Sequence, residues 1–163
     1  PPAPRFPFFL RAYRYFCYSS IAQLHHSREA TAAIEAGINK RITILSNEEE
    51  AHLGFLGASL DRYLDHGTMV DIGGGSTELT HILDGLDLDK VSIPQGSLSS
   101  FANYTSGILP SAKEVETIAK QFRTLASKEG AEIYASKQLY GIGGSIRSAA
   151  KVYGDLCNDG ERI

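Results

Sequence analysis

Three consecutive glycines, Gly73, Gly74 and Gly75, separate two segments that have the residue patterns of β-strands. Residues 68–72 form a short apolar run typical of a buried strand, and residues 76–83 alternate between apolar and polar. Glycine adopts positive φ angles and has no side chain, so such a turn can direct several backbone N–H groups at one ligand. The pattern therefore predicts a hairpin whose turn binds an anion.

The residues beside this turn favour a phosphate rather than a simple anion. Ser76 and Thr77 follow the glycines and would add hydroxyl donors, while Asp71 ends the preceding strand. A carboxylate in that position can hold a hydrated Mg²⁺ ion that faces bound phosphates. A tight hairpin without a ligand is the alternative, and it would not require three glycines.

Two other nucleotide-binding motifs fit this stretch poorly. A Walker loop ends in Gly-Lys-Ser/Thr, and no lysine is present here. A dinucleotide fingerprint opens a helix, whereas residues 77–82 alternate like a strand. The order of strand, glycine turn and strand instead resembles the phosphate hairpin of the actin/Hsp70/sugar-kinase superfamily.

An acidic helix start precedes the hairpin. Ser46 and Glu49 have the spacing of a capping box, in which each side chain bonds the other residue's backbone amide. This leaves Glu48 and Glu50 without a structural explanation, although acidic residues in a first helical turn commonly just complement the helix dipole.

The residues that follow Glu50 at helical spacing suggest where its side chain points. Leu53, Gly54 and Gly57 lie three, four and seven positions later and predict an inward-facing, closely packed side of the helix. A carboxylate on that side points into the protein or a cleft. If it meets the glycine turn, it could activate a water for attack on a terminal phosphoryl group.

A second glycine turn occurs near the end of the chain. Gly143 and Gly144 separate a predicted strand, residues 139–142, from a predicted helix, residues 145–153. Helix N-termini attract anions, and Arg147 would add a charged contact one turn into the helix. The alternative is that these glycines only allow close packing of the helix on the strand.

The bulk composition is that of an ordinary globular protein, with a formal net charge of −3, so any phosphate site must be local. No apolar run is long enough to span a bilayer, and no signal-peptide pattern is found, which predicts a cytoplasmic protein. Cys17 and Cys157 lack metal-ligand spacing and are expected to be reduced thiols in the core.

Strands and helices interleave along the chain, which predicts an α/β fold with a mixed sheet flanked by helices. We expect one domain over residues 1–163 that begins directly in a strand and looks like an excerpt of a larger protein. The further expected strands are residues 11–19, 41–45 and 90–93, and the further helices are residues 28–34 (ended by Gly37), 46–63, 97–104 and 111–128.

Taken together, residues 44–51 (ILSNEEEA), 70–78 (VDIGGGSTE) and 141–147 (GIGGSIR) resemble the exopolyphosphatase/guanosine pentaphosphate phosphohydrolase (Ppx/GppA) family. Residues 93–99 are similar to the segment after that family's hairpin, and the resemblance covers roughly residues 13–153. It implies a ribonuclease-H-like domain of the actin/Hsp70/sugar-kinase superfamily. The expected domain is the second half of a two-domain phosphatase core, with a short piece of the first.

The resemblance also implies site residues and a cofactor. Glu50 matches the family's proposed catalytic base, and Asp71 matches its metal-associated aspartate, with Mg²⁺ as the implied ion. The implied phosphate-binding residues are Gly73, Gly74, Gly75, Ser76, Thr77, Gly143, Gly144 and Arg147.

Three departures from the family pattern stand out. The family's first phosphate loop and the helical extension after its last glycine motif are both missing, and Ala22 stands where the family has an arginine. The expected activity is release of terminal phosphate from inorganic polyphosphate or guanosine pentaphosphate, with no nucleic-acid or membrane partner. The sequence is compatible with a homodimer.

Two other functions stay open at this stage. A non-catalytic module that binds (p)ppGpp or polyphosphate is favoured by Ala22 and by the missing first loop. A kinase of the same superfamily would need an adenosine pocket and sugar-binding residues, for which the sequence has no sign.

Overall fold

The structure is a computed structural model that describes residues 15–17, 27–60 and 62–157. The chain separates into two compact units, Pro1–Ser46 and Asn47–Ile163, and each is described by itself. The expectation that the first unit is a piece of a preceding domain stays a prediction.

The first unit contains two short parallel strands and a helix. Strand β1 (Tyr15–Cys17) pairs with β2 (Ile42–Ile44), and helix α1 (Ser27–Ile38) lies between them in sequence. The prediction that Gly37 ends this helix is wrong by two residues. Asn39 ends it instead, with a φ of 50°, a left-handed conformation that asparagine tolerates.

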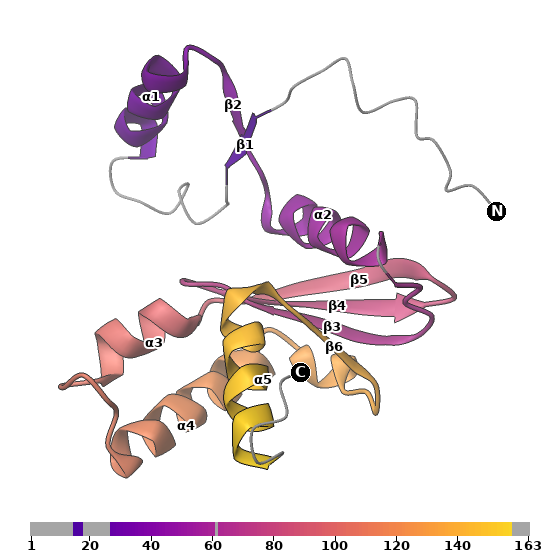
Figure 1. Ribbon diagram of the computed structural model, residues 1–163, viewed down its shortest axis with the longest axis vertical. Helices are drawn as coiled ribbons and strands as arrows, with labels where there is room; N and C mark the ends of the chain where they lie inside the picture. Colours follow the sequence, from indigo (N-terminus) through magenta and orange to yellow (C-terminus); the bar gives the residue numbers. More distant parts are fainter. Residues whose placement is uncertain (1–14, 18–26, 61, 158–163) are drawn as a thin grey trace. The chain divides into compact units, whose positions relative to one another are not determined.

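The second unit is built on a four-stranded mixed sheet (Figure 1). Its order is β5-β4-β3-β6, with β4 antiparallel to both neighbours and β6 parallel to β3. The strands are β3 (Gly67–Ile72), β4 (Thr77–Leu83), β5 (Leu86–Ile93) and β6 (Leu139–Ile142).

Both predicted hairpins form. The triglycine turn joins β3 to β4, and a two-residue turn of Asp84 and Gly85 joins β4 to β5. The φ angles of Asp84 and Gly85 are 54° and 73°, as a tight hairpin with Asp-Gly at its centre requires. Strand β5 begins at Leu86, four residues before the predicted start.

Helices cover both faces of this sheet (Figure 1). Helix α2 (Asn47–Ser59) packs on one face, against β3, β4 and β5. On the other face lie α3 (Ser97–Tyr104), α4 (Ala112–Lys128), the short 3-10 helix η2 (Ala131–Tyr134) and α5 (Gly143–Cys157).

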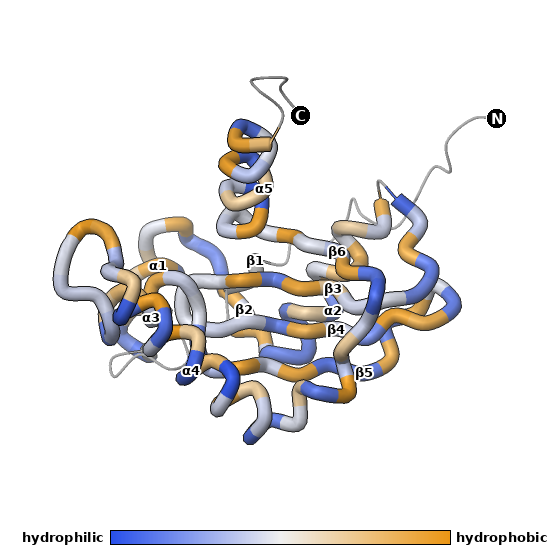
Figure 2. Tube along the Cα trace, turned by 90° about the horizontal axis from the view of Figure 1, so that it is seen from below, coloured by the Kyte–Doolittle hydropathy of each residue, from blue (hydrophilic) through white to orange (hydrophobic). Residues whose placement is uncertain are grey.

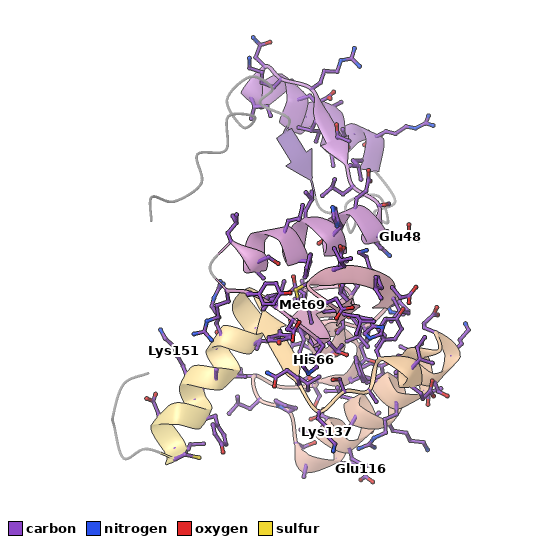
Figure 3. All side chains as sticks on the ribbon, turned by 90° about the vertical axis from the view of Figure 1, so that its right-hand side faces the viewer. Glu48, His66, Met69, Glu116, Lys137 and Lys151 are labelled. Carbon is purple, nitrogen blue, oxygen red and sulfur yellow. The ribbon has the colours of Figure 1, made fainter. Side chains whose placement is uncertain are left out.

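The core of the second unit lies between α2 and the sheet. Phe55 and Leu64 pack there with Met69 and Ile82, and Figure 3 shows Met69 beneath α2. Figure 2 shows polar and apolar residues alternating along the strands, as expected for a sheet with two distinct faces.

The predicted inward side of α2 is partly wrong. Leu53 is exposed, and no atom lies within 4 Å of a side chain built at Gly57. The buried side instead contains Ala51 and Phe55, with Gly54 against Ile142 and Met69. The apolar side is thus rotated by about one residue relative to the prediction, which puts Glu50 at its edge.

The short helix η2 was not predicted. Two further expectations need correction. Helix α5 begins at Gly143, so the second glycine pair forms its first turn rather than a separate turn before Ser145. Cys157 is a free, exposed thiol at the end of α5 and not a core residue.

Within the described residues, no helix is both long and apolar enough to cross a membrane.

Helix α4 begins with a capping box that holds a strongly acidic carboxyl group. Glu114 accepts hydrogen bonds from the backbone N–H and the hydroxyl of Ser111, both at 2.7 Å. It also accepts from the N–H and hydroxyl of Ser106, at 2.9 and 2.8 Å. These hydrogen bonds lower the pKa of Glu114 from 4.5 to about 2.

This lowered pKa predicts acid-sensitive stability. Because the pKa is lower in the folded state than in the unfolded state, the contribution of Glu114 is complete above pH 4.5 and is lost as the pH falls towards 2. We expect the native protein to lose more unfolding free energy than E114Q between about pH 6 and about pH 3, measured by urea denaturation.

The matched control is E116Q, because Glu116 is an exposed carboxylate on the same helix and is labelled in Figure 3. It should show the same pH dependence as the native protein. An equal loss in E114Q and the native protein would contradict the assignment.

Candidate functional site

Strand register places the candidate site residues in one row across the sheet. Asp71 of β3 lies directly opposite Glu78 of β4 and beside Ile142 of β6. Glu78 in turn lies opposite Ser92 of β5. Directly opposed residues in a sheet point to the same face, so the two carboxylates share one face.

That face is the one covered by α2. Along each strand side chains alternate between faces, and Met69 and Ile82 contact Phe55 of α2. Asp71 is two residues from Met69, and Glu78 is four from Ile82, so both carboxylates also face α2. The first turn of α2 holds Glu50 above this row.

Glu50 lies close enough to Asp71 and Glu78 for its charge to act on both. Burial raises the pKa of Asp71 and of Glu78 most, and the negative charge of the half-buried Glu50 raises both pKa values further. The structure therefore brings the predicted base and the predicted metal-associated aspartate to one place and adds a third carboxylate.

Asp71 is held in an environment that disfavours its charge. Burial is the main cause that raises its pKa, and the negative charge of Glu50 raises it further. Arg147 of α5 opposes this effect, so the predicted cation near the site is present.

Glu78 is the most deeply buried of the three carboxylates, with 6% of its surface exposed. Burial raises its pKa most, while hydrogen bonds from the hydroxyls of Ser76 and Ser92 lower it. The Ser92 hydroxyl lies 3.0 Å from Oε1. The charges of Glu50 and Asp71 then raise the pKa again, so repulsion and hydrogen bonding oppose each other at one group.

The second glycine motif lies against the Asp71 carboxylate through Gly143. A Cβ atom at Gly143 would collide with Oδ1 of Asp71, and the φ of Gly143 is +82°. Only glycine meets both conditions without strain. The first turn of α5 is therefore positioned directly against Asp71, while a Cβ at Gly144 would meet only open space.

The triglycine turn lies at the end of the same two strands. It is closed by a hydrogen bond from the Gly73 N–H to the Ser76 carbonyl, 3.0 Å long. Gly74 and Gly75 are exposed, so their backbone is accessible to a ligand.

Two hydroxyls expected to face a phosphate are used elsewhere. The Thr77 hydroxyl donates to the Gln95 carbonyl at 2.8 Å, and Thr77 is only 2% exposed. Thr77 precedes Glu78, so its side chain points to the opposite face of the sheet. The Ser76 hydroxyl bonds to Glu78. Both hydroxyls thus bond to protein groups in this structure, and their role as phosphate donors stays a prediction.

A polar cluster fixes α2 on the sheet near the site. Nδ1 of His52 lies 2.7 Å from Oδ2 of Asp87 in β5, and Nζ of Lys90 lies 2.8 Å from the same oxygen. Burial alone would raise the pKa of Asp87, but hydrogen bonds and charges from Lys90 and His52 lower it. His52 follows Glu50 by two residues, so this cluster helps to fix the first turns of α2.

Sequence reasoning did not single out Glu78 as a site residue, although a signal was available. A tight turn at residues 73–76 makes Ile72 and Thr77 partners, and the next pair outward is Asp71 and Glu78. Register alone therefore pairs a carboxylate with the predicted metal residue.

The donor set suits a magnesium ion. Carboxylate oxygens are the ligands Mg²⁺ prefers, and it usually takes one or two of them together with water and substrate phosphates. Asp71 and Glu78 are neighbouring carboxylates whose repulsion a cation would relieve. Among the described residues, no group of three or more His, Cys, Asp or Glu side chains is arranged to hold a metal ion. Ala22, the departure from the expected arginine, lies outside the described residues.

One family of known proteins matches the sequence. Residues 23–154 match the sequence profile of the Ppx/GppA phosphatase family. The chain matches no curated protein sequence.

Solved structures show the same fold. The chain resembles an exopolyphosphatase from Cytophaga hutchinsonii with a TM-score of 0.77 and 18% identity, over 92% of this chain and 49% of that one. The Aquifex aeolicus PPX-GPPA enzyme gives 0.68 and 18%, over 87% and 47%. An exopolyphosphatase-like protein gives 0.75 and 22%, over 85% and 46%.

The chain thus spans about half the length of these solved proteins. The likeness shows the predicted α/β fold, with a mixed sheet flanked by helices. Its assignment to the ribonuclease-H-like domains of the actin/Hsp70/sugar-kinase superfamily stays a prediction. With a profile match that covers most of its residues and a site built from the expected motifs, the chain belongs to the Ppx/GppA phosphatase family.

Proposed function

We propose that this chain carries the catalytic half-site of a phosphohydrolase that releases terminal phosphate from inorganic polyphosphate or guanosine pentaphosphate. The observation that carries the proposal is the register that pairs Asp71 with Glu78 beside the triglycine turn, with Glu50 close enough for its charge to act on both carboxyl groups. A base, a cation site and a set of amide donors are the parts that phosphoryl transfer requires.

In the proposed reaction, Glu50 accepts a proton from a water molecule whose oxygen attacks the terminal phosphorus. The bond from this phosphorus to the bridging oxygen breaks, and the shortened phosphate chain leaves with that oxygen. The amides of the triglycine turn and the positive end of α5 hold the charge on the phosphoryl oxygens. Arg147, beside Asp71, adds a fixed positive charge.

Asp71 and Glu78 would hold Mg²⁺, which when bound neutralises charge on the phosphates. Gly143 has no side chain and so leaves room for the Asp71 carboxylate against the start of α5. Ser92 and Ser76 fix the position of the Glu78 carboxylate by hydrogen bonds. The two carboxylates are therefore oriented by the protein itself before any ligand binds.

The choice between polyphosphate and guanosine pentaphosphate, the cytoplasmic location and a homodimer all stay predictions. Exopolyphosphatase is the description carried by the solved relative from Cytophaga hutchinsonii, and it supports the polyphosphate alternative.

The first prediction concerns the base. In the full-length protein, E50Q should lower the rate of phosphate release from polyphosphate by about 10²–10⁴-fold, because the amide cannot take the proton from water. Polyphosphate binding, measured by calorimetry, should persist. Unchanged turnover would remove this mechanism.

The matched control is E48Q. Glu48 belongs to the same acidic turn, is exposed, and is labelled at the start of α2 in Figure 3. Its replacement should leave turnover close to that of the native protein. Binding without phosphate release in the native protein would favour the non-catalytic module instead, and phosphate transfer from ATP to a sugar would favour the kinase.

The second prediction concerns the contact of α5 with Asp71. G143A places a methyl group on the Asp71 carboxylate and forces alanine into a left-handed conformation, which costs about 1–2 kcal/mol. We expect a displaced Asp71, a higher Mg²⁺ concentration for half-maximal phosphate release, and a lower thermal midpoint.

G57A is the control, since Gly57 lies on α2 with no atom within 4 Å of the added methyl. It should leave the Mg²⁺ dependence unchanged. A native Mg²⁺ dependence in G143A would show that Asp71 does not hold the ion.

A further inference from the structure

The first turn of α3 packs against the triglycine turn through its backbone. The Ser97 N–H donates to the Gly73 carbonyl and the Ser99 N–H to the Gly74 carbonyl, both at 2.9 Å. The Ser97 hydroxyl also donates to the Gly73 carbonyl, at 3.1 Å. The Ser97 and Ser99 N–H groups of this helix terminus thus bond to the turn rather than to a ligand.

The Ser99 side chain completes these contacts. Its oxygen accepts from the Gly96 N–H at 2.9 Å, and its hydroxyl proton is shared between the Gly96 carbonyl at 3.3 Å and the Gly75 carbonyl at 3.4 Å. The carbonyls of Gly73, Gly74 and Gly75 are therefore all in contact with donors from the start of α3.

Gly96 allows this approach because it has no side chain. A Cβ atom at Gly96 would lie 2.5 Å from the Gly73 carbonyl oxygen and 2.7 Å from the Gly74 carbonyl carbon. Both are backbone atoms, which cannot move aside as a flexible side chain would. The contact also reaches the second glycine motif, since the hydroxyls of Ser145 and Ser97 lie 3.4 Å apart.

The direction of the carbonyls determines that of the amides. In a trans peptide unit the C=O and the following N–H point in opposite directions. Carbonyls of Gly73, Gly74 and Gly75 that face α3 thus direct the N–H groups of the next residues away from α3. These are the N–H groups of Gly74, Gly75 and Ser76, whereas the Gly73 N–H is already bonded to Ser76.

We propose that Gly96, Ser97 and Ser99 are positioning residues that hold the Gly74, Gly75 and Ser76 amides in a phosphate-binding arrangement before substrate arrives. The proposal rests on the proposed function, since it concerns how the same turn binds polyphosphate. A cradle fixed in advance avoids the ordering cost that a mobile glycine loop would incur on binding.

The test uses two variants of this contact in the full-length protein, with inorganic polyphosphate as substrate. S97A removes the hydroxyl contacts with the Gly73 carbonyl and with Ser145, and should raise KM by about two- to tenfold. S97T keeps the hydroxyl and should have a KM close to that of the native protein, because Ser97 is exposed and leaves room for a methyl group. G96A should raise KM by about tenfold or more, because it displaces the turn itself.

S100A is the matched control. Ser100 lies on the same helix, but its hydroxyl contacts Gln95 Nε2 at 3.0 Å and not the triglycine turn. A loss of stability reduces the fraction of folded enzyme and hence kcat, and leaves KM unchanged. S100A should therefore have the native KM even if its thermal midpoint falls.

The outcomes separate this proposal from the proposed function. A native KM in both S97A and G96A, with normal native turnover, would overturn the positioning role and leave the phosphohydrolase in place. A native protein that neither binds nor cleaves polyphosphate or guanosine pentaphosphate would instead overturn the proposed function. If G96A does not fold, the KM values of S97A, S97T and S100A still test the positioning role.

Discussion

The antiparallel pairing of β3 with β4 is the constraint on which the rest of the site depends. It sets Asp71 opposite Glu78, and it forces the chain to reverse within the glycine segment between Ile72 and Thr77. A shift of one residue would turn every side chain of one strand to the other face. The same register therefore fixes both the carboxylate pair and the place of the turn that ends beside it.

Placing several carboxylates together under a helix destabilises the folded state unless hydrogen bonds or positive charges offset their burial and repulsion. Burial disfavours the charged forms of Asp71 and Glu78, and the charge of Glu50 adds to this effect. The hydroxyls of Ser76 and Ser92 offset part of it at Glu78, and Arg147 does so at Asp71. Hydrogen bonds to charged groups contribute about 1.5–3 kcal/mol each, which explains why two serines surround the most buried carboxylate.

Much of the fold could be predicted from the sequence, because periodicity and turn residues are local signals. Both hairpins, the α/β order and the helix at residues 97–104 follow from such signals. The inward side of α2 was misplaced, since Leu53 and Gly57 are as compatible with a buried side as Ala51 and Phe55 are. Only the sheet beneath the helix decides which side is covered.

The candidate site residues could be identified where each lies within a single sequence motif. Contacts between residues of different elements could not be predicted. Glu50, Asp71 and Gly143 were found from their own motifs, but contact of Gly143 with Asp71 depends on the parallel pairing of β6 with β3. The contact of the Thr77 hydroxyl with the Gln95 carbonyl was not predictable, because the strand position of Thr77, not its residue type, places its side chain on the opposite face. Hydroxyls next to a glycine turn therefore need a known strand phase before they can be assigned to a ligand.

The glycines around the site serve different purposes, and this bears on how the turn works. Gly143 has a positive φ, whereas Gly73, Gly74, Gly75 and Gly96 do not. Gly96 is instead required by close backbone approach, as is Gly141, whose Cβ would collide with Ile146. The main role of glycine at this site is therefore to let backbone segments approach one another closely, rather than to allow unusual backbone angles. A turn held by packed backbone contacts is stiff, and stiffness is what a cradle needs if its amides are to match the charge of a transition state without reorganising.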